Sequence, residues 1–264
     1  MKIIMIGHGM VGHKFIESVL EHVGDDVEIT ILAEEPRLAY DRVHLTEYFS
    51  GKSAKDLTLC RADFADAYGI DLRLNTKAVA IDQSHKTVTT NHGDVLSFDK
   101  LILATGSYAF VPPISGNDRE NCFVYRTIED LDAIRAASLN AKSGVVSGGG
   151  LLGLEAAKAL RDLNLETHVV EFAPRLMAVQ IDDLGGKVLR AKIENLGVKV
   201  HTQKATSSIE EGATTKHVMK FGDGSELETD IILFSAGIRP RDELARQSGL
   251  ALGERGGIMI NDYC

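Results

Sequence analysis

The chain has 264 residues, 44% hydrophobic and 25% charged, which is enough for one large or two ordinary globular domains with sizeable cores. Its formal net charge of −9 argues against non-specific binding to nucleic acids or anionic membranes, and no apolar run approaches the length of a membrane span. Three cysteines without a C-x-x-C pair, and histidines without metal-ligand spacing, disfavour a disulfide framework, a dithiol redox centre and a metal site, and suggest a reducing cytoplasm.

The first predicted element is an apolar strand over residues 2–6, which runs directly into a glycine motif. The motif, GHGMVG, has the spacing G-x-G-x-x-G, and residues 10–23 have the apolar periodicity of a helix. A second strand is expected over residues 27–33, followed by acids at the separation where a ribose-binding acid belongs. This unit predicts a dinucleotide site, but the motif alone does not distinguish FAD from NAD. The candidate residues are Gly7, Gly9, Met10, Gly12, Glu34 and Glu35.

The chain then becomes irregular over residues 36–51, a stretch rich in Arg, Tyr and His. It is either a segment that covers a bound cofactor, with contacts from Arg42, Val43 and Leu45, or a solvated loop with an aromatic anchor. Residues 56–68 have helical apolar spacing. Alternating segments then predict an antiparallel meander with strands at residues 78–81, 87–90 and 95–98.

A fully apolar strand is expected over residues 101–107, and it ends in a glycine turn that can bring backbone next to a cofactor. The candidate residues in this turn are Ala104, Thr105 and Gly106. Consecutive prolines at 112–113 stop regular structure and predict a crossover to a second domain. A short strand at residues 122–126 and a helix at residues 128–137 follow.

Residues 145–171 repeat the opening pattern of strand, glycine turn, helix, strand and acid. In such a motif the first glycine allows a tight turn, the second lets backbone approach a pyrophosphate, and the third lets helix and strand pack closely. The surrounding strands, helix and acid favour a dinucleotide site over a purely structural glycine turn. The candidate residues are Gly148, Gly150, Leu151, Gly153 and Glu171.

After this unit a helix is expected over residues 183–196, with an inward face made of Leu184, Val188, Ile193 and Leu196. Strand-like segments then occur at residues 198–201, 217–221 and 228–233. Residues 231–237 mirror the earlier apolar strand and end at Gly237, another candidate binding residue, before a second crossover at Pro240.

The two halves of the chain therefore share one order of elements. This predicts an α/β fold of two Rossmann-like dinucleotide-binding domains, each a parallel sheet with an antiparallel meander, the second inserted in the first. The expected domains are residues 1–111 with 237–264, and residues 112–236.

Several strings together resemble the two-dinucleotide-binding pyridine nucleotide–disulfide oxidoreductase superfamily, over essentially the whole chain. The most discriminating are YDRVHL, GGGLLGLEAA and EFAPRLM, which are most similar to the N-terminal FAD- and NADH-binding region of the large subunit of assimilatory NAD(P)H nitrite reductases. The resemblance implies FAD at the first motif, with Arg42 beside the flavin, and NADH at the second. Glu155 matches an acid that often lies near the nicotinamide, although a favourable charge at a helix N-terminus is an equal alternative.

The sequence departs from this superfamily in two places. No cysteine precedes Cys60, and His44 and Thr46 stand where a redox cysteine would lie, so thiol chemistry is not expected. The chain stops at INDYC without the superfamily's final FAD segment, and without the siroheme and [4Fe-4S] ligands of nitrite reductases. We therefore expect a fragment whose full-length parent holds those centres, while this chain does not bind them.

The resemblance implies an FAD-dependent module that oxidises NADH and passes electrons toward siroheme and iron–sulfur centres, for reduction of nitrite to ammonia by the parent. Its expected partners are the downstream half of the parent chain and a small subunit, with no nucleic acid and no membrane. The flavin carries the chemistry, so we assign no catalytic residue. Glu171 predicts NADH over NADPH, a preference that Arg175 could soften. The alternatives are an NADH-dependent rubredoxin or ferredoxin reductase, and a dinucleotide-binding module without turnover.

Overall fold

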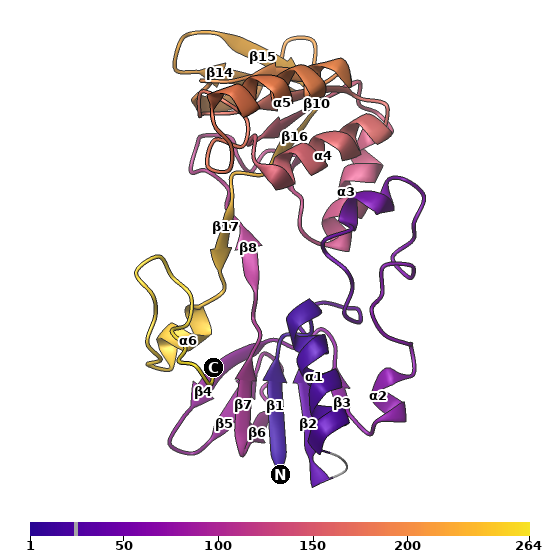
Figure 1. Ribbon diagram of the computed structural model, residues 1–264, viewed down its shortest axis with the longest axis vertical. Coiled ribbons are helices and arrows are strands. Elements are labelled where there is room, and N and C mark those ends of the chain that lie inside the picture. The colour runs from indigo at the N-terminus through magenta and orange to yellow at the C-terminus, as the bar shows by residue number, and fades with distance from the viewer. Residues whose placement is uncertain (24–25) are drawn as a thin grey trace. The chain divides into compact units, whose positions relative to one another are not determined.

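The computed structural model describes residues 1–23 and 26–264, and its internal contacts divide the chain into two compact units (Figure 1). The first unit contains Met1–Arg42, Ala54–Tyr108 and Arg239–Cys264. The second unit contains Val43–Ser53 and Ala109–Ile238. The chain passes between the units at four points: after Arg42, after Ser53, and within strands β8 (Ser107–Ala109) and β17 (Ile238–Pro240).

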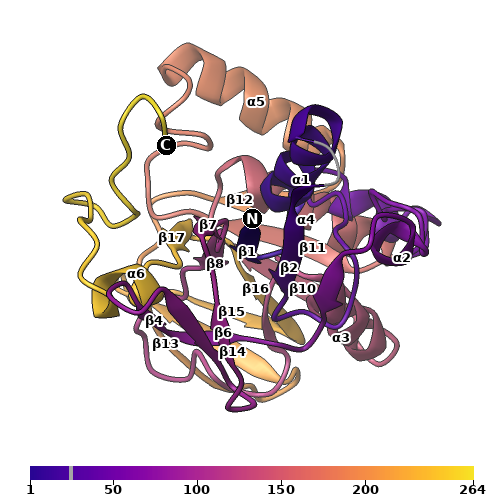
Figure 2. The ribbon, with the colours of Figure 1, turned by 90° about the horizontal axis from the view of Figure 1, so that it is seen from below.

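The first unit has a parallel sheet in the order β3-β2-β1-β7. Its strands are β1 (Lys2–Ile6), β2 (Glu28–Leu32), β3 (Asp71–Arg73) and β7 (Lys100–Leu103). Helix α1 (Met10–Val23) lies beside β1 and β2 in both views (Figures 1 and 2). Met5 of β1 packs with Ile16 of α1 on one face of the sheet, whereas Ile4 and Ile6 pack with Val88 of the meander on the other. This alternation follows from the two-residue period of a strand.

The meander of the first unit is antiparallel, with strands β4 (Ala78–Asp82), β5 (Thr87–Thr90) and β6 (Val95–Ser97). The remaining helices of this unit are short, namely α2 (Phe64–Ala67) and α6 (Glu243–Gln247).

The second unit repeats this architecture with a five-stranded parallel sheet in the order β12-β11-β10-β16-β9. Its strands are β9 (Cys122–Val124), β10 (Ser143–Ser147), β11 (Glu166–Val170), β12 (Lys199–His201) and β16 (Ile231–Phe234). Its helices are η2 (Leu45–Tyr48, a 3-10 turn), α3 (Ile128–Ser138), α4 (Leu151–Asp162) and α5 (Asp183–Asn195). Its meander is β13 (Thr206–Glu211), β14 (His217–Phe221) and β15 (Glu226–Thr229).

The core of the second unit also has two layers. Val146 and Val169 face Leu160 of α4, while the neighbouring Val145 and Val170 face the meander. The predicted α/β fold with parallel sheets and antiparallel meanders is confirmed, and each sheet places its glycine motif at the carboxyl end of a central strand.

The expected helix over residues 56–68 is wrong for most of its length, because only α2 is helical. The backbone of residues 57–59 pairs instead with residues 39–41: Asp41 N–H donates to the Leu57 carbonyl, and Leu59 N–H donates to the Ala39 carbonyl, both at 2.9 Å. These bonds use backbone groups that a helix would need, and they bury Leu57.

The expected inward face of α5 is wrong for three of its four residues. Leu184, Val188 and Leu196 are 72%, 52% and 59% exposed. The helix packs through Ile193, as expected, and through Leu189, and Gly186 lies against the side chain of Arg175. The other three residues chosen from the sequence lie on the exposed side of the same helix, which also carries apolar residues.

Two expected strands are interrupted. Residues 228–233 divide at Asp230, whose carboxylate accepts hydrogen bonds from the backbone N–H groups of Lys142 at 2.8 Å and Ser143 at 3.1 Å. Residues 101–107 divide into β7 and β8, with a turn between them. Strand β13 was not predicted.

Candidate functional site

The first glycine motif is shaped by its own backbone. Gly7 has φ +103°, and a Cβ there would lie 2.3 Å from the Ala104 carbonyl oxygen. A Cβ on Gly12 would lie 2.4 Å from the Gly7 carbonyl oxygen. At Gly9, in contrast, no heavy atom of the described chain lies within 4 Å of where a Cβ would be. The outer glycines are therefore required by packing, while the middle one faces open space at the start of α1, which begins at Met10.

The two acids after β2, Glu34 and Glu35, both form ion pairs with basic side chains. Glu34 forms ion pairs with Lys77 at 3.3 Å and with Arg241. Glu35 accepts a hydrogen bond from the Tyr40 hydroxyl at 2.8 Å and forms an ion pair with Arg42. The Arg42 guanidinium lies over the Tyr40 ring, 4.5 Å from its centre. The structure thus brings Glu35 and Arg42 together.

The candidate turn after β7 is tied to the segment that follows β17. The Thr105 hydroxyl donates to the Arg241 carbonyl at 2.7 Å, and the Arg241 N–H donates to the Gly106 carbonyl at 3.0 Å. The carbonyl oxygen of Ala104 is the atom that lies too close to Gly7 for a Cβ to fit there. Gly106 has φ +70°, which explains the glycine.

A buried histidine pair next to the first motif was not predicted. His8 and His13 are 8% and 4% exposed, and their ring centres lie 5.7 Å apart. The ring of Phe64 stacks on His8 at 6.4 Å. Burial, with a smaller contribution from His13, lowers the pKa of His8 to about 4. Burial also lowers the pKa of His13, against the opposing charge of Glu17. Both imidazoles are therefore neutral near pH 7.

The second glycine motif has the same geometry as the first. Gly148 has φ +128°, and a Cβ there would lie 2.3 Å from the Ser235 carbonyl oxygen. A Cβ on Gly153 would lie 2.0 Å from the Gly148 carbonyl oxygen, whereas at Gly150 no described heavy atom lies within 4 Å. Gly150 is the N-cap of α4 and has no side chain to bind the first N–H groups of the helix. These groups are thus open to a phosphate.

Glu171 directly follows β11, and its carboxylate is held by backbone. One oxygen accepts the Gly149 N–H at 2.5 Å, and the other accepts the Ala173 N–H at 2.6 Å. Arg175 lies on the same loop, but its guanidinium donates to the Ile181 carbonyl at 3.0 Å and pairs with Asp183 at 2.7 Å.

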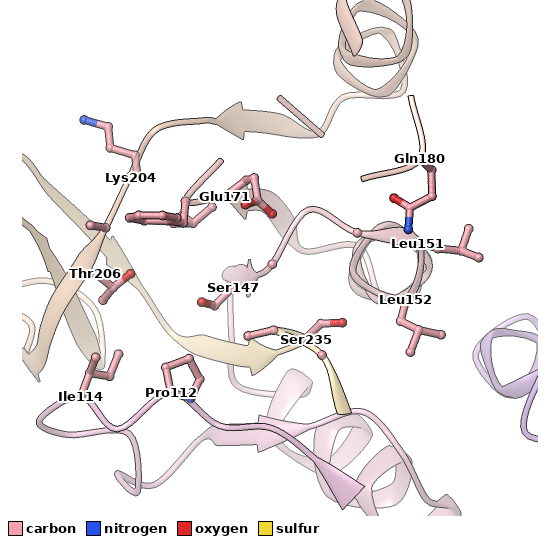
Figure 3. A pocket seen from close by; sticks show the side chains of 17 residues that line it. Pro112, Ile114, Ser147, Leu151, Leu152, Glu171, Gln180, Lys204, Thr206 and Ser235 are labelled. Carbon is pink, nitrogen blue, oxygen red and sulfur yellow. The ribbon is translucent and has the colours of Figure 1, made fainter. Parts of the chain in front are cut away.

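A cavity of about 740 Å³ lies beside the second glycine motif, within the second unit (Figure 3). Of the predicted site residues it is lined by Gly148, Gly150, Leu151, Glu171 and Gly237. Gly153 and Glu155 are not among its lining residues. Figure 3 shows Leu151, Leu152 and Gln180 on the side of helix α4. Lys204, Thr206 and Ile114 lie on the opposite side.

Sequence reasoning missed several of the lining residues. Phe172 follows β11, Lys204 follows β12, and Ser235 follows β16. All of them lie just beyond the carboxyl ends of parallel strands, where ligands bind in open α/β sheets. That rule could have identified them before the structure was known.

Glu155 lies one turn inside α4 and is half-buried, on the same unit as His44. Burial raises the pKa of Glu155, and the charge of His44 opposes this shift. The Tyr125 hydroxyl donates to the Thr46 hydroxyl at 3.3 Å, and burial raises the pKa of Tyr125 to about 12. His44 and Thr46, which stand where a redox cysteine would lie, both belong to the second unit.

Leu45 and Val43, the expected cofactor contacts, also lie in this segment. Leu45 is buried and Val43 is 63% exposed. Arg135 holds the segment in place, because its guanidinium lies 4.1 Å from the centre of the Tyr48 ring and donates to the Tyr48 carbonyl at 2.6 Å.

Within residues 1–23 and 26–264, no group of three or more His, Cys, Asp or Glu side chains is arranged to hold a metal ion. The same residues contain no helix that is long and apolar enough to cross a membrane.

Comparison with known proteins identifies one family and relatives that are oxidoreductases. The family model described as pyridine nucleotide-disulphide oxidoreductase matches residues 1–264. The chain is 53% identical to the nitrite reductase (NADH) large subunit of Escherichia coli (strain K12), over 100% of this chain and 31% of that protein. It is 54% identical to the nitrite reductase [NAD(P)H] large subunit of Klebsiella oxytoca, over 99% of this chain and 27% of that protein. The chain thus spans less than a third of the length of these relatives.

A solved structure with a similar fold is the NAD-dependent persulfide reductase from A. fulgidus. It superposes with a TM-score of 0.93 at 29% identity, and covers 100% of this chain and 51% of that one.

Proposed function

Because the chain belongs to the pyridine nucleotide-disulphide oxidoreductase family, we propose that it is an FAD-dependent module that oxidises NADH. The observation that carries the proposal is the repeated glycine geometry. In each unit the outer glycines are enforced by close backbone contacts, while the middle glycine, Gly9 or Gly150, faces open space at a helix N-terminus. Two such sites in one chain fit two dinucleotides.

FAD is assigned to the first unit. Gly9 leaves room for a pyrophosphate beside the N-terminus of α1, and Glu34 lies at the end of β2, where a ribose acid is needed. Glu35, Arg42 and the turn at residues 104–106 complete the proposed set. When bound, FAD supplies the hydride acceptor and can release the electrons singly. The chain's residues bind and orient the cofactor, and none is required as a general acid or base.

NADH is assigned to the cavity of the second unit, with its pyrophosphate at Gly150 and its adenosine ribose at Glu171. The carboxylate of Glu171 can accept hydrogen bonds from ribose hydroxyls and would repel a 2′-phosphate. Arg175 does not offset this preference, because its guanidinium is bound to loop carbonyls and Asp183. Glu155 either approaches the nicotinamide or stabilises the N-terminus of α4 by its charge.

The electrons are proposed to leave for siroheme and iron–sulfur centres in the rest of a longer chain, which together with a small subunit would reduce nitrite to ammonia. Support comes from the relatives named nitrite reductase, of which this chain matches 31% and 27%. A reductase of rubredoxin or ferredoxin remains the alternative, and is separated from the proposal by the acceptor that oxidises the reduced protein.

The proposal is tested with the purified chain, loaded with FAD and freed of oxygen. We expect one equivalent of NADH to bleach the flavin absorbance, and NADPH to require a much higher concentration. Flavin that stays oxidised although NADH raises the melting temperature would contradict turnover and favour a binding module without it. Comparable affinities for NADH and NADPH would contradict the role of Glu171.

A further inference from the structure

An aromatic side chain at the proposed NADH cavity has no role in the function described so far. Phe172 lines the cavity and is 77% exposed. It is not part of the two apolar clusters around the sheet of the second unit, whereas Leu176 on the same loop is fully buried. Water contact with a phenyl ring is unfavourable, so a ring kept exposed inside a cavity fits a surface that a ligand covers.

The position of Phe172 indicates which part of a ligand it would meet. Phe172 directly follows Glu171, the residue proposed to bind the adenosine ribose, so their Cα atoms lie about 3.8 Å apart, and both residues line the cavity. The adenine ring is bonded to that same ribose. An aromatic side chain on the residue after Glu171 is therefore placed to meet the base, and not the nicotinamide at the other end of the dinucleotide.

The side of the cavity opposite α4 is suited to an uncharged base. Ile114 and Thr206 line it, and the Lys204 ammonium there is bound to Asp223 and Ser225, each at 2.6 Å. Its charge is thus balanced within the second unit. We propose that Phe172 is the platform on which the adenine of NADH stacks, which makes it a specificity-determining residue for the adenosine half of the ligand. This inference rests on the proposed NADH site and goes beyond it.

The test compares Phe172→Ala and Phe172→Tyr with Val179→Ala, a matched change at a 93% exposed apolar residue of the same loop that does not line the cavity. Calorimetric titrations use NADH, ADP-ribose, and reduced nicotinamide mononucleotide, which lacks adenosine. For Phe172→Ala we expect Kd to rise about tenfold for NADH and ADP-ribose, the scale of base–aromatic stacking, with no change for the mononucleotide. Phe172→Tyr and Val179→Ala should bind as the unchanged chain does.

An unchanged NADH affinity in Phe172→Ala, with normal binding by the parent chain, would overturn the stacking inference alone. So would an equal loss of affinity for the mononucleotide. If the parent chain binds neither NADH nor ADP-ribose, the proposed function fails and the inference fails with it. Melting curves of each variant separate loss of affinity from loss of folding.

Discussion

Gly150→Ala and Gly153→Ala should separate the ligand-binding role of the second motif from its packing role. In Gly153→Ala the new methyl would lie 2.0 Å from the Gly148 carbonyl oxygen, so α4 must move by more than 1 Å against a buried strand. Overpacking of this kind costs about 3 kcal/mol, which lowers the melting temperature by about 10 °C for a unit of this size. In Gly150→Ala the methyl meets no described atom within 4 Å, and φ is −79°, so the substitution introduces neither a clash nor backbone strain.

The two variants should therefore differ in opposite ways in two assays. Gly150→Ala should lower the melting temperature by only about 3 °C, because alanine in place of glycine at an N-cap costs up to about 1 kcal/mol. Its NADH affinity should fall at least about tenfold, since the methyl takes the space where a pyrophosphate approaches the backbone. Differential scanning fluorimetry and NADH titration measure the two effects. Unchanged NADH binding in Gly150→Ala would refute the assignment of the pyrophosphate site.

The remaining predictions address charge, acid stability and helix capping. Glu171→Gln should weaken NADH binding about tenfold and narrow the gap between NADH and NADPH in parallel titrations, because a charged acceptor of ribose hydrogen bonds is lost. Burial holds the pKa of His8 at about 4, below the unfolded value of 6.5, so the folded state binds fewer protons and stability falls as the pH drops from about 6.5 to 4. The loss approaches about 3 kcal/mol in urea unfolding at pH 4, and His8→Phe should remove most of this pH dependence. Thr127→Ala removes the hydrogen bond from the Asp130 N–H in the capping box of α3, and thermal unfolding should show a loss of about 1 kcal/mol.

Local sequence was sufficient for the parts of the fold whose geometry is decided locally. Gly7 and Gly148 occupy left-handed turns that few other residues tolerate, and both motifs lie between a strand and a helix as expected. The meander of the first unit was found because alternation of apolar residues has a clear period, whereas β13 of the second meander was missed. The candidate residues Gly148, Gly150 and Glu171 line one cavity for the same reason, since they lie within a single strand–helix–strand unit.

Features that depend on distant partners were not predictable in this way. The side of α5 that packs could not be chosen from the sequence, because Val188 and Leu189 are both apolar and only the sheet decides between them. Likewise, the burial of His8 depends on Phe64, which is far away in the chain. Residues 57–59 are not helical because their backbone pairs with residues 39–41, a contact that the local sequence does not show.

The two motifs share the same glycine geometry, but the acids that follow them are held differently. Glu34 is oriented by the side chains of Lys77 and Arg241, whereas Glu171 is oriented by backbone N–H groups of Gly149 and Ala173. A carboxylate has about four lone-pair sites, so either acid can keep these bonds and still accept ribose hydroxyls. Preorganisation of this kind lowers the cost of binding. The half-exposed ion pairs at Glu34 are weakened by salt, and each can be removed by substituting its partner, Lys77 or Arg241. The bonds at Glu171 cannot be removed by changing any other side chain, because backbone N–H groups make them. The second site is therefore the more robust of the two, because its geometry is built into the backbone that also forms the motif.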